Sequence, residues 1–316
     1  MIGKKTMKSL QHVALLTTTA ALAACGGTTP PVGISAGAAP PATPRQSVGG
    51  ARSMQLLYVA ENSLSKIDVY DAGKYDAGPV AEITAGVDDP VGLCIGADGV
   101  LYVANNSSNS ISEYEPGKTT PFQTITDGLD FPEYCALDSR GNLWVTNLAG
   151  SVTEYKKGTT TPRTTITNGV SLPTGIAFDR SGNLYVANLD AESGYVAVYA
   201  EGGKVPSRTI TDGIWDADGI AVDTKGTLYV TNLVTQTGNY GDVEEYKAGQ
   251  NQPYQTIGHL DSPEDVIVNN AGYAYVSENH TPAVVVFKRG STKPWHEFRQ
   301  GMNGPAGIAY YVGTPP

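Results

Sequence analysis

The 316-residue sequence contains little of the residue types from which most reactive sites are built. It has three cysteines and four histidines. It lacks a Cys-x-x-Cys pair, a glycine-rich phosphate loop and the spacing of a Ser-His-Asp triad. It is also poor in positive charge, because 21 Lys and Arg stand against 31 Asp and Glu, a net charge of −10. An acidic surface repels phosphate backbones, so nucleic acid is not an expected partner.

The apolar run near the start, residues 13–24, is too short to span a bilayer as a mature helix. Three lysines precede it and Leu22-Ala23-Ala24-Cys25 ends it, which is the layout of a signal peptide over residues 1–25. The tetrapeptide resembles the bacterial lipobox, which implies cleavage before Cys25 and lipid attachment to its thiol. The alternative is an ordinary secretory signal with a cysteine there by chance.

The lipobox resemblance implies a protein held at the bacterial cell envelope by its N-terminal lipid, because several acyl chains give stable anchoring. Gly26 follows the cysteine. The resemblance implies that this residue permits transfer to the outer membrane in a Gram-negative cell. Without its leader the chain keeps 18 basic and 31 acidic residues, a net charge of −13.

Residues 26–53 have the composition of a flexible tether. Eleven of these 28 residues are Pro or Gly, and the two arginines are the only charged residues. Such a segment has no apolar face to bury, and its mean end-to-end distance is about 30 Å. The expected organisation is therefore a leader (1–25), a tether (26–53) and a globular part (54–316).

A five-residue sequence motif recurs along the globular part. Leu101-Tyr102-Val103-Ala104-Asn105 is followed by copies that end at Asn147, Asn188, Asn232 and Glu278, and an earlier copy ends at Glu61. Pro-x-Gly-like steps at Pro90, Pro132, Pro173, Ala217, Pro263 and Pro305 set intervals of 42, 41, 44, 46 and 42 residues. Repeats of this period indicate one repetitive architecture.

Each unit has the sequence signals of four short antiparallel strands. The first strand is apolar and follows the Pro step. A turn that begins with Asp and ends with Gly comes next, and the Leu-Tyr-Val motif forms the second strand. A third strand ends in an aromatic residue, and a fourth carries Thr-Ile-Thr or a variant. Four strands in 41–46 residues are typical of a β-propeller blade.

The two ends of the repeat are complementary. The unit that begins at Leu56 lacks a first strand, whereas residues 305–312 supply a first strand with nothing after it. Pairing the two closes a ring of six blades and removes exposed sheet edges. A stacked solenoid is the alternative, but it would require polar caps instead of half-units.

The segment Pro173 to Asn188 resembles the NHL repeat, and residues 54–312 resemble the six-bladed propellers of the regucalcin and gluconolactonase-like superfamily. The resemblance implies an all-β, six-bladed propeller with a loop face around a central channel. It is weak as a guide to activity, because this fold carries many functions.

The expected ligand face collects residues from two positions of the repeat. The second strands end there in Glu61, Asn105, Asn147, Asn188, Asn232 and Glu278, and the Pro steps add Glu133, Asp218 and Glu264 to the uncharged Val91, Thr174 and Ala306. Oxygen ligands that converge on an axis suit Ca²⁺ or another divalent cation. The alternative for the asparagines is hydrogen bonding to nearby backbone.

An enzymatic interpretation is a divalent-metal-dependent lactone or ester hydrolase. The gluconolactonase resemblance implies three metal ligands, of which Asp218 matches one, while Thr174 and Ala306 stand where the family has Asn and Glu. Streptogramin-lyase-like propellers use His in a Pro-His-Gly step, and no Pro step in this sequence contains His. A different metal or acid-base cluster could form from Asp218, Glu264, Glu278 and His280, although an exposed loop histidine is the commoner case.

Cys94 and Cys135 lie on the first strands of adjacent units, offset by one position. They point to opposite faces of their own blades and so could meet between blades as a disulfide, which an extracytoplasmic location permits. Because other units carry Ala or Ile there, the sequence favours two separately buried small residues.

Two function classes remain. The first is a lipid-anchored, monomeric binding or scaffold propeller whose loop face takes a small molecule, a glycan or a protein. The second is the metal-dependent hydrolase. The incomplete catalytic set and the uniform repeats favour the first. The long loop from Leu233 to Asp242 is the feature most specific to this chain.

Overall fold

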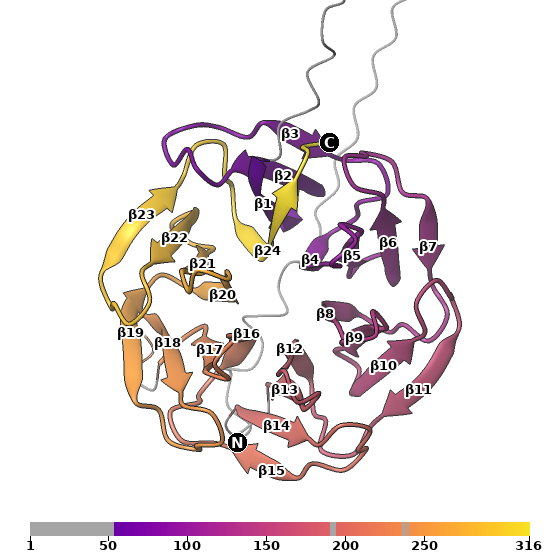
Figure 1. The fold of residues 1–316 in the computed structure, drawn as a ribbon, viewed down its shortest axis with the longest axis vertical. Coiled ribbons are helices and arrows are strands. Elements are labelled where there is room, and N and C mark those ends of the chain that lie inside the picture. Colours follow the sequence, from indigo (N-terminus) through magenta and orange to yellow (C-terminus); the bar gives the residue numbers. More distant parts are fainter. Residues whose placement is uncertain (1–53, 190–193, 236–237, 239) are drawn as a thin grey trace, which may run out of the picture. The chain divides into compact units, whose positions relative to one another are not determined.

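The computed structural model describes residues 54–316 except 190–193, 236–237 and 239. Arg52–Pro316 forms one compact unit. The leader, Cys25 and the tether lie outside the described residues. The described chain forms six four-stranded antiparallel sheets around a centre, so the prediction of an all-β, six-bladed propeller is confirmed (Figure 1).

Five blades follow the chain without interruption, and in each of them the strands run in sequence order from the innermost to the outermost. Blade 2 contains β4 (Pro90–Ile95), β5 (Leu101–Asn105), β6 (Ser110–Tyr114) and β7 (Gln123–Ile125). Blade 3 contains β8 (Pro132–Leu137), β9 (Leu143–Asn147), β10 (Ser151–Tyr155) and β11 (Pro162–Ile166). Blade 4 contains β12 (Pro173–Phe178), β13 (Leu184–Asn188), β14 (Tyr195–Tyr199) and β15 (Arg208–Ile210). Blade 5 contains β16 (Ala217–Val222), β17 (Leu228–Asn232), β18 (Gly241–Tyr246) and β19 (Gln255–Leu260). Blade 6 contains β20 (Pro263–Val268), β21 (Ala274–Glu278), β22 (Ala283–Phe287) and β23 (Pro294–Phe298).

Blade 1 is built from both ends of the globular part. Its order is β24 (Pro305–Gly313), β1 (Met54–Glu61), β2 (Lys66–Asp71) and β3 (Ala81–Ile83), with a short 3-10 turn η1 at Asn62–Leu64. The β1–β24 register pairs Leu57 with Tyr310 and Val59 with Ile308. The predicted closure of the ring by the C-terminal strand is therefore confirmed.

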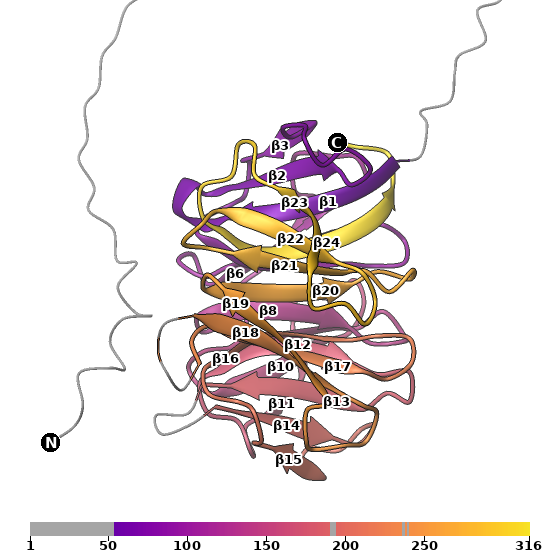
Figure 2. The same ribbon diagram turned by 90° about the vertical axis from the view of Figure 1, so that its left-hand side faces the viewer.

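The strands run between the two faces of the ring (Figure 2). Antiparallel order puts the start of each first strand and the end of each second strand at one face, because Pro90 pairs with Asn105 and Pro263 with Glu278. We call this the ligand face. The turns between first and second strands lie at the opposite face.

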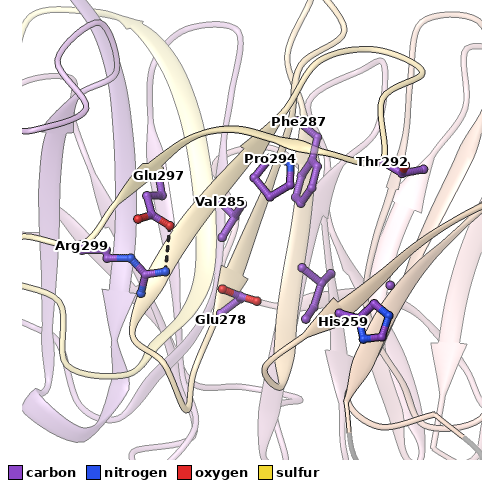
Figure 3. A pocket seen from close by; sticks show the side chains of 10 residues that line it. His259, Glu278, Val285, Phe287, Thr292, Pro294, Glu297 and Arg299 are labelled. Atoms are coloured by element: carbon purple, nitrogen blue, oxygen red, sulfur yellow. Dashed lines mark hydrogen bonds and ion pairs between the residues drawn. The ribbon is translucent and has the colours of Figure 1, made fainter.

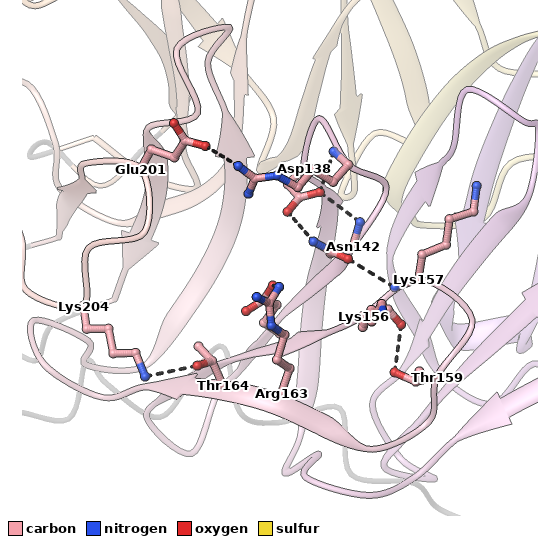
Figure 4. A network of polar contacts seen from close by, with 11 residues as sticks. Asp138, Asn142, Lys156, Lys157, Thr159, Arg163, Thr164, Glu201 and Lys204 are labelled. Carbon is pink, nitrogen blue, oxygen red and sulfur yellow. Dashed lines mark hydrogen bonds and ion pairs between the residues drawn. The ribbon is translucent and has the colours of Figure 1, made fainter.

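The turns of that opposite face have the hydrogen bonds that the Asp-x-x-Gly pattern predicts. In blade 3, Asp138 Oδ1 accepts the backbone N–H groups of Arg140 and Asn142 at 2.8 and 2.9 Å (Figure 4). Gly141 has φ +77°, a conformation that favours glycine. Arg140 also pairs with Glu201 of blade 4 at 2.8 Å. Being exposed, this pair stabilises the ring little.

The glycine of the Pro-x-Gly step is required by close approach of neighbouring first strands. A Cβ at Gly175 would collide with the carbonyl oxygen of Asp218 in the next blade, and one at Gly307 with that of Val91. The first strands therefore pack backbone to backbone around the centre. Side chains appear at this position in two blades, as Tyr134 and Asp265.

Aromatic residues that end the third strands are the largest fully buried side chains, and five are tyrosines that hold loops between blades. Their hydroxyls donate to loop carbonyls: Tyr70 to Gln300, Tyr114 to Ala85, Tyr155 to Asp127, Tyr199 to Asn168 and Tyr246 to Asp212, at 2.6–3.1 Å. The sixth blade has Phe287 instead. The apolar clusters likewise lie between adjacent blades.

Replacing Tyr199 with Phe is expected to lower the free energy of unfolding by about 1–2 kcal/mol, because the carbonyl of Asn168 loses its donor inside the structure. Urea unfolding followed by circular dichroism measures this change. Tyr240→Phe is the control, since Tyr240 is 52% exposed and should change stability by less than about 0.5 kcal/mol. Equal stability of the Tyr199 variant and the parent would contradict the role of this hydroxyl.

Cys94 and Cys135 form a disulfide between β4 and β8, with their Cα atoms 5.7 Å apart. The expectation of two separately buried cysteines was wrong. The offset of one position lets the two side chains face each other across the boundary of blades 2 and 3.

Among the residues that the structure describes, no helix is long and apolar enough to cross a membrane.

Candidate functional site

The six residues that end the second strands each make the same kind of hydrogen bond. Each side-chain oxygen accepts the backbone N–H that lies two residues before the first strand of its own blade. The pairs are Asn105 with Asp88, Asn147 with Asp130, Asn188 with Ser171, Asn232 with Trp215, Glu278 with Asp261 and Glu61 with Asn303, at 2.8–3.0 Å. All six are at most 7% exposed. These side chains fix the loops of the ligand face, as the alternative interpretation of the asparagines expected.

The Pro-step residues occupy the second positions of the innermost strands (Figure 1). Glu133 of β8, Asp218 of β16 and Glu264 of β20 contribute carboxylates where these strands begin, at the ligand face. The other three positions are uncharged. Thr174 donates its hydroxyl to the carbonyls of Ala217 and Asp218 at 3.1 and 3.2 Å, which joins blades 4 and 5.

Tyr134 crosses the centre of the ring. It starts from β8, and its hydroxyl donates to the backbone carbonyl of Glu264 on β20, which lies across the channel, at 3.3 Å. Its side chain is 4% exposed. The phenol therefore bridges the innermost strands of two opposite blades, next to the carboxylates.

The carboxylates around Tyr134 differ in their partners. Asp218 is 6% exposed, and no hydrogen bond to its carboxylate occurs in the described part of the chain. Glu133 is half-buried and accepts one bond from Asn106 Nδ2 at 2.9 Å. Asp265 is buried and accepts the N–H groups of Val266 and Ile308 at 2.8 and 2.9 Å, which anchors β24. Asp218 and the half-buried Glu264 are thus the two carboxylates of the group that accept no hydrogen bond in the described part of the chain.

Burial raises the pKa of every acid in this group, and repulsion by neighbouring acids adds to the rise for Glu133, Asp218 and Glu264. Burial, together with the negative charges of Glu264 and Asp89, raises the pKa of Glu133 to about 8. Burial, then Glu264 and Glu133, raises the pKa of Asp218 well above its usual value. Burial, then the charge of Asp265, raises the pKa of Glu264 to about 7. Burial also raises the pKa of Asp265 to about 7, against its two backbone hydrogen bonds.

We call this acidic group, Glu133, Asp218, Glu264 and Asp265 around Tyr134, the acidic mouth. No Lys or Arg contributes to the pKa shifts of these four carboxyl groups within the described ranges. A ligand that brings positive charge would relieve the repulsion between them and replace the protons that they hold near neutral pH. The site can thus bind a cationic group or hold protons.

The candidate metal ligands are not assembled in one place. Glu278 bonds to the Asp261 N–H, and His280 lies on the surface with Nδ1 3.6 Å from Asp261. Residues 54–316, without the undescribed positions, contain no group of three or more His, Cys, Asp or Glu placed to hold a metal ion. The residues present therefore do not form the ligand set of a Ca²⁺ site.

Sequence reasoning missed Tyr134 and Asp265. The signal was present, because both replace the glycine that four other Pro steps carry at the same position. Each of these side chains reaches another first strand, since Tyr134 bonds to the Glu264 carbonyl of β20 and Asp265 to the Ile308 N–H of β24. The sequence does not show that the phenol reaches Glu264 across the channel.

Comparison with known proteins supports the fold alone. No family profile matches the chain, and no curated protein matches it. A chain of a nidogen/laminin complex superposes with a TM-score of 0.69 at 21% identity, covering 82% of this chain and 99% of that one. Hydrazine synthase of Kuenenia stuttgartiensis superposes with a TM-score of 0.56 at 14% identity, covering 74% and 73%. The class of this protein is the six-bladed β-propeller, whereas membership of the NHL or regucalcin group remains a prediction.

Proposed function

We propose that this chain is a lipid-anchored binding or scaffold module of the bacterial cell envelope, which takes a positively charged group of a ligand or partner protein at the acidic mouth. The observation that carries the proposal is Asp218, whose carboxylate is 6% exposed and unpartnered in the described part of the chain while Glu133 and Glu264 repel it. An unpaired buried carboxylate is costly, so a structure that keeps one offers a position for a cation.

The shape of the mouth limits how the ligand enters. Tyr134 bridges β8 and β20 at the centre of the ring, so we expect a narrow group to approach from the ligand face. A lysine side chain fits this requirement, because its ammonium is a compact charge at the end of a thin apolar stem. A chain of similar fold occurs in a nidogen/laminin complex, so a ring of this type is known in a protein assembly.

Titration with a trilysine peptide, followed by calorimetry, tests the proposal. We expect saturable binding that Asp218→Asn weakens at least tenfold, since the substitution keeps the side chain's shape and removes its charge. Asp76→Asn is the matched control, because Asp76 is exposed on the loop between β2 and β3, away from the ligand face. Equal affinities of the parent and the Asp218 variant would reject the acidic mouth as the site.

Addition of Ca²⁺ or a chelator to the same samples decides between the two function classes. A melting temperature that changes with neither Ca²⁺ nor the chelator supports the binding module. A large rise with Ca²⁺ that Asp218→Asn abolishes would instead support the metal-dependent hydrolase, because only the folded state would bind the ion.

Replacing Cys25 with Ser is expected to move the protein from the membrane fraction to the soluble fraction. The substitution removes the thiol to which the proposed lipids attach, and anchoring depends on those chains. Immunoblots of fractionated bacterial cells measure the distribution, with Cys94→Ser as the control cysteine. Retention of the Cys25 variant in membranes would contradict lipid anchoring. Gel filtration of the soluble variant tests the expected monomer.

A further inference from the structure

A cavity lies between blades 5 and 6, and none of the residues of the acidic mouth line it. It has a volume of about 260 Å³ (Figure 3). One wall is the end of β19, from Gly258 to Leu260, and the other is formed by β22 and β23. Glu278 is among its lining residues, with Val285 and Phe287 beside it.

The cavity follows from two departures of this pair of blades from the repeat. The fourth strand of blade 5 continues to Leu260, which pairs with Gly241 after the long loop of that blade, whereas β7 and β15 end at their isoleucines. Blade 6 also has Val285 where blade 2 has Ser112, the hydroxyl that receives the side-chain N–H of Asn105 at 3.1 Å. Glu278 therefore loses the partner available to its counterpart in blade 2.

Only one of the two oxygens of the Glu278 carboxylate accepts a hydrogen bond. Its Oε1 accepts the Asp261 N–H at 2.9 Å, while Oε2 has no hydrogen-bond partner in the part of the chain that the structure describes. The residue is only 7% exposed, and its side chain points into the cavity (Figure 3). A carboxylate oxygen that has no partner and faces a cavity is a strong acceptor for a donor that enters there.

The charges around the cavity leave a net negative site. Arg299 lines it, but its guanidinium is paired with Glu297 at 2.8 Å. Glu278 forms no ion pair of its own within the described ranges, while the charge of Arg299 offsets part of the rise in its pKa that burial causes. The remaining walls combine the apolar Leu260, Val285, Phe287 and Pro294 with the polar His259 and Thr292.

We propose that this cavity binds a primary ammonium group carried on a short alkyl chain, with the ammonium on Glu278 Oε2 and the alkyl chain against Val285 and Phe287. The volume suits a molecule of a few heavy atoms. Binding would satisfy the free oxygen and cover apolar surface at once. This site is separate from the acidic mouth and does not depend on the function proposed for it.

Titration of the full chain with n-butylammonium at pH 7, followed by the ligand's NMR signals, tests the assignment. We expect saturable binding that Glu278→Gln weakens at least tenfold, because Gln keeps the acceptor for the Asp261 N–H and loses the charge. Glu61→Gln is the matched control, since Glu61 makes the equivalent bond in blade 1 and does not line this cavity. Asp218→Asn should also leave this binding unchanged.

A neutral ligand provides a test that needs no variant. We expect n-butanol, which has the same alkyl chain and no charge, to bind at least tenfold more weakly than n-butylammonium. Absence of saturable butylammonium binding, equal binding of n-butanol, or equal losses in the Glu278 and Glu61 variants would overturn the proposal.

Discussion

A chain that ends at Gly304, and so lacks β24, is expected to fail to form a monomeric propeller. Without β24 the inner edge of β1 loses its partner strand, and buried side chains such as Leu57 and Val59 lose the residues that cover them. An open apolar edge strand also promotes association between copies. We expect loss of the cooperative melting transition in circular dichroism and elution as aggregates.

A second truncation provides the control. Removal of residues 314–316 leaves β24 intact through Gly313 and should change the melting temperature by no more than a few degrees. A chain ending at Gly304 that melts cooperatively as a monomer would show that the ring does not depend on this strand.

The folded protein is expected to be more stable at pH 5 than at pH 8. In the acidic mouth, the pKa of Glu133 is raised to about 8 and those of Glu264 and Asp265 to about 7, with burial as the largest cause. The folded state therefore binds protons that the unfolded state has already released, so stability falls as pH rises through these values. We expect the melting temperature to drop by at least about 5 °C over this interval.

Neutral substitutions identify the source of this pH dependence. The double variant Glu133→Gln, Asp218→Asn should melt with a smaller difference between pH 5 and pH 8, because two of the interacting groups no longer titrate. Buried acids elsewhere, such as Glu244 with a pKa of about 7, will leave part of the effect. Asp76→Asn should leave it unchanged. A melting temperature that rises from pH 5 to pH 8 would contradict the burial of these acids.

Much of the architecture could be predicted because the repeated residues are those that local backbone structure, such as a tight turn, requires. Asp138 and Gly141 mark a turn through hydrogen bonding and a positive φ that depend only on nearby residues. The half-units at Leu56 and Pro305 could be matched because an unpaired strand edge is unfavourable. These inferences require no knowledge of how side chains meet across the ring.

The candidate site was less predictable because it depends on contacts between distant blades. Glu61 and Glu278 both depart from Asn and keep the same backbone bond, yet only Glu278 lines the cavity. That difference arises from Leu260 and Val285, which belong to other strands. Likewise, Tyr134 could be recognised as a departure from glycine, but its reach to Glu264 depends on the width of the closed ring.

The central claim is that the acidic mouth around Tyr134 receives a positively charged group. A crystal structure of the full chain with the trilysine peptide tests it most directly. We predict a lysine ammonium within hydrogen-bonding distance of the Asp218 carboxylate, with Glu133 and Glu264 around it. A peptide bound elsewhere on the ring, with the carboxylate of Asp218 free of any cationic partner, would contradict the account.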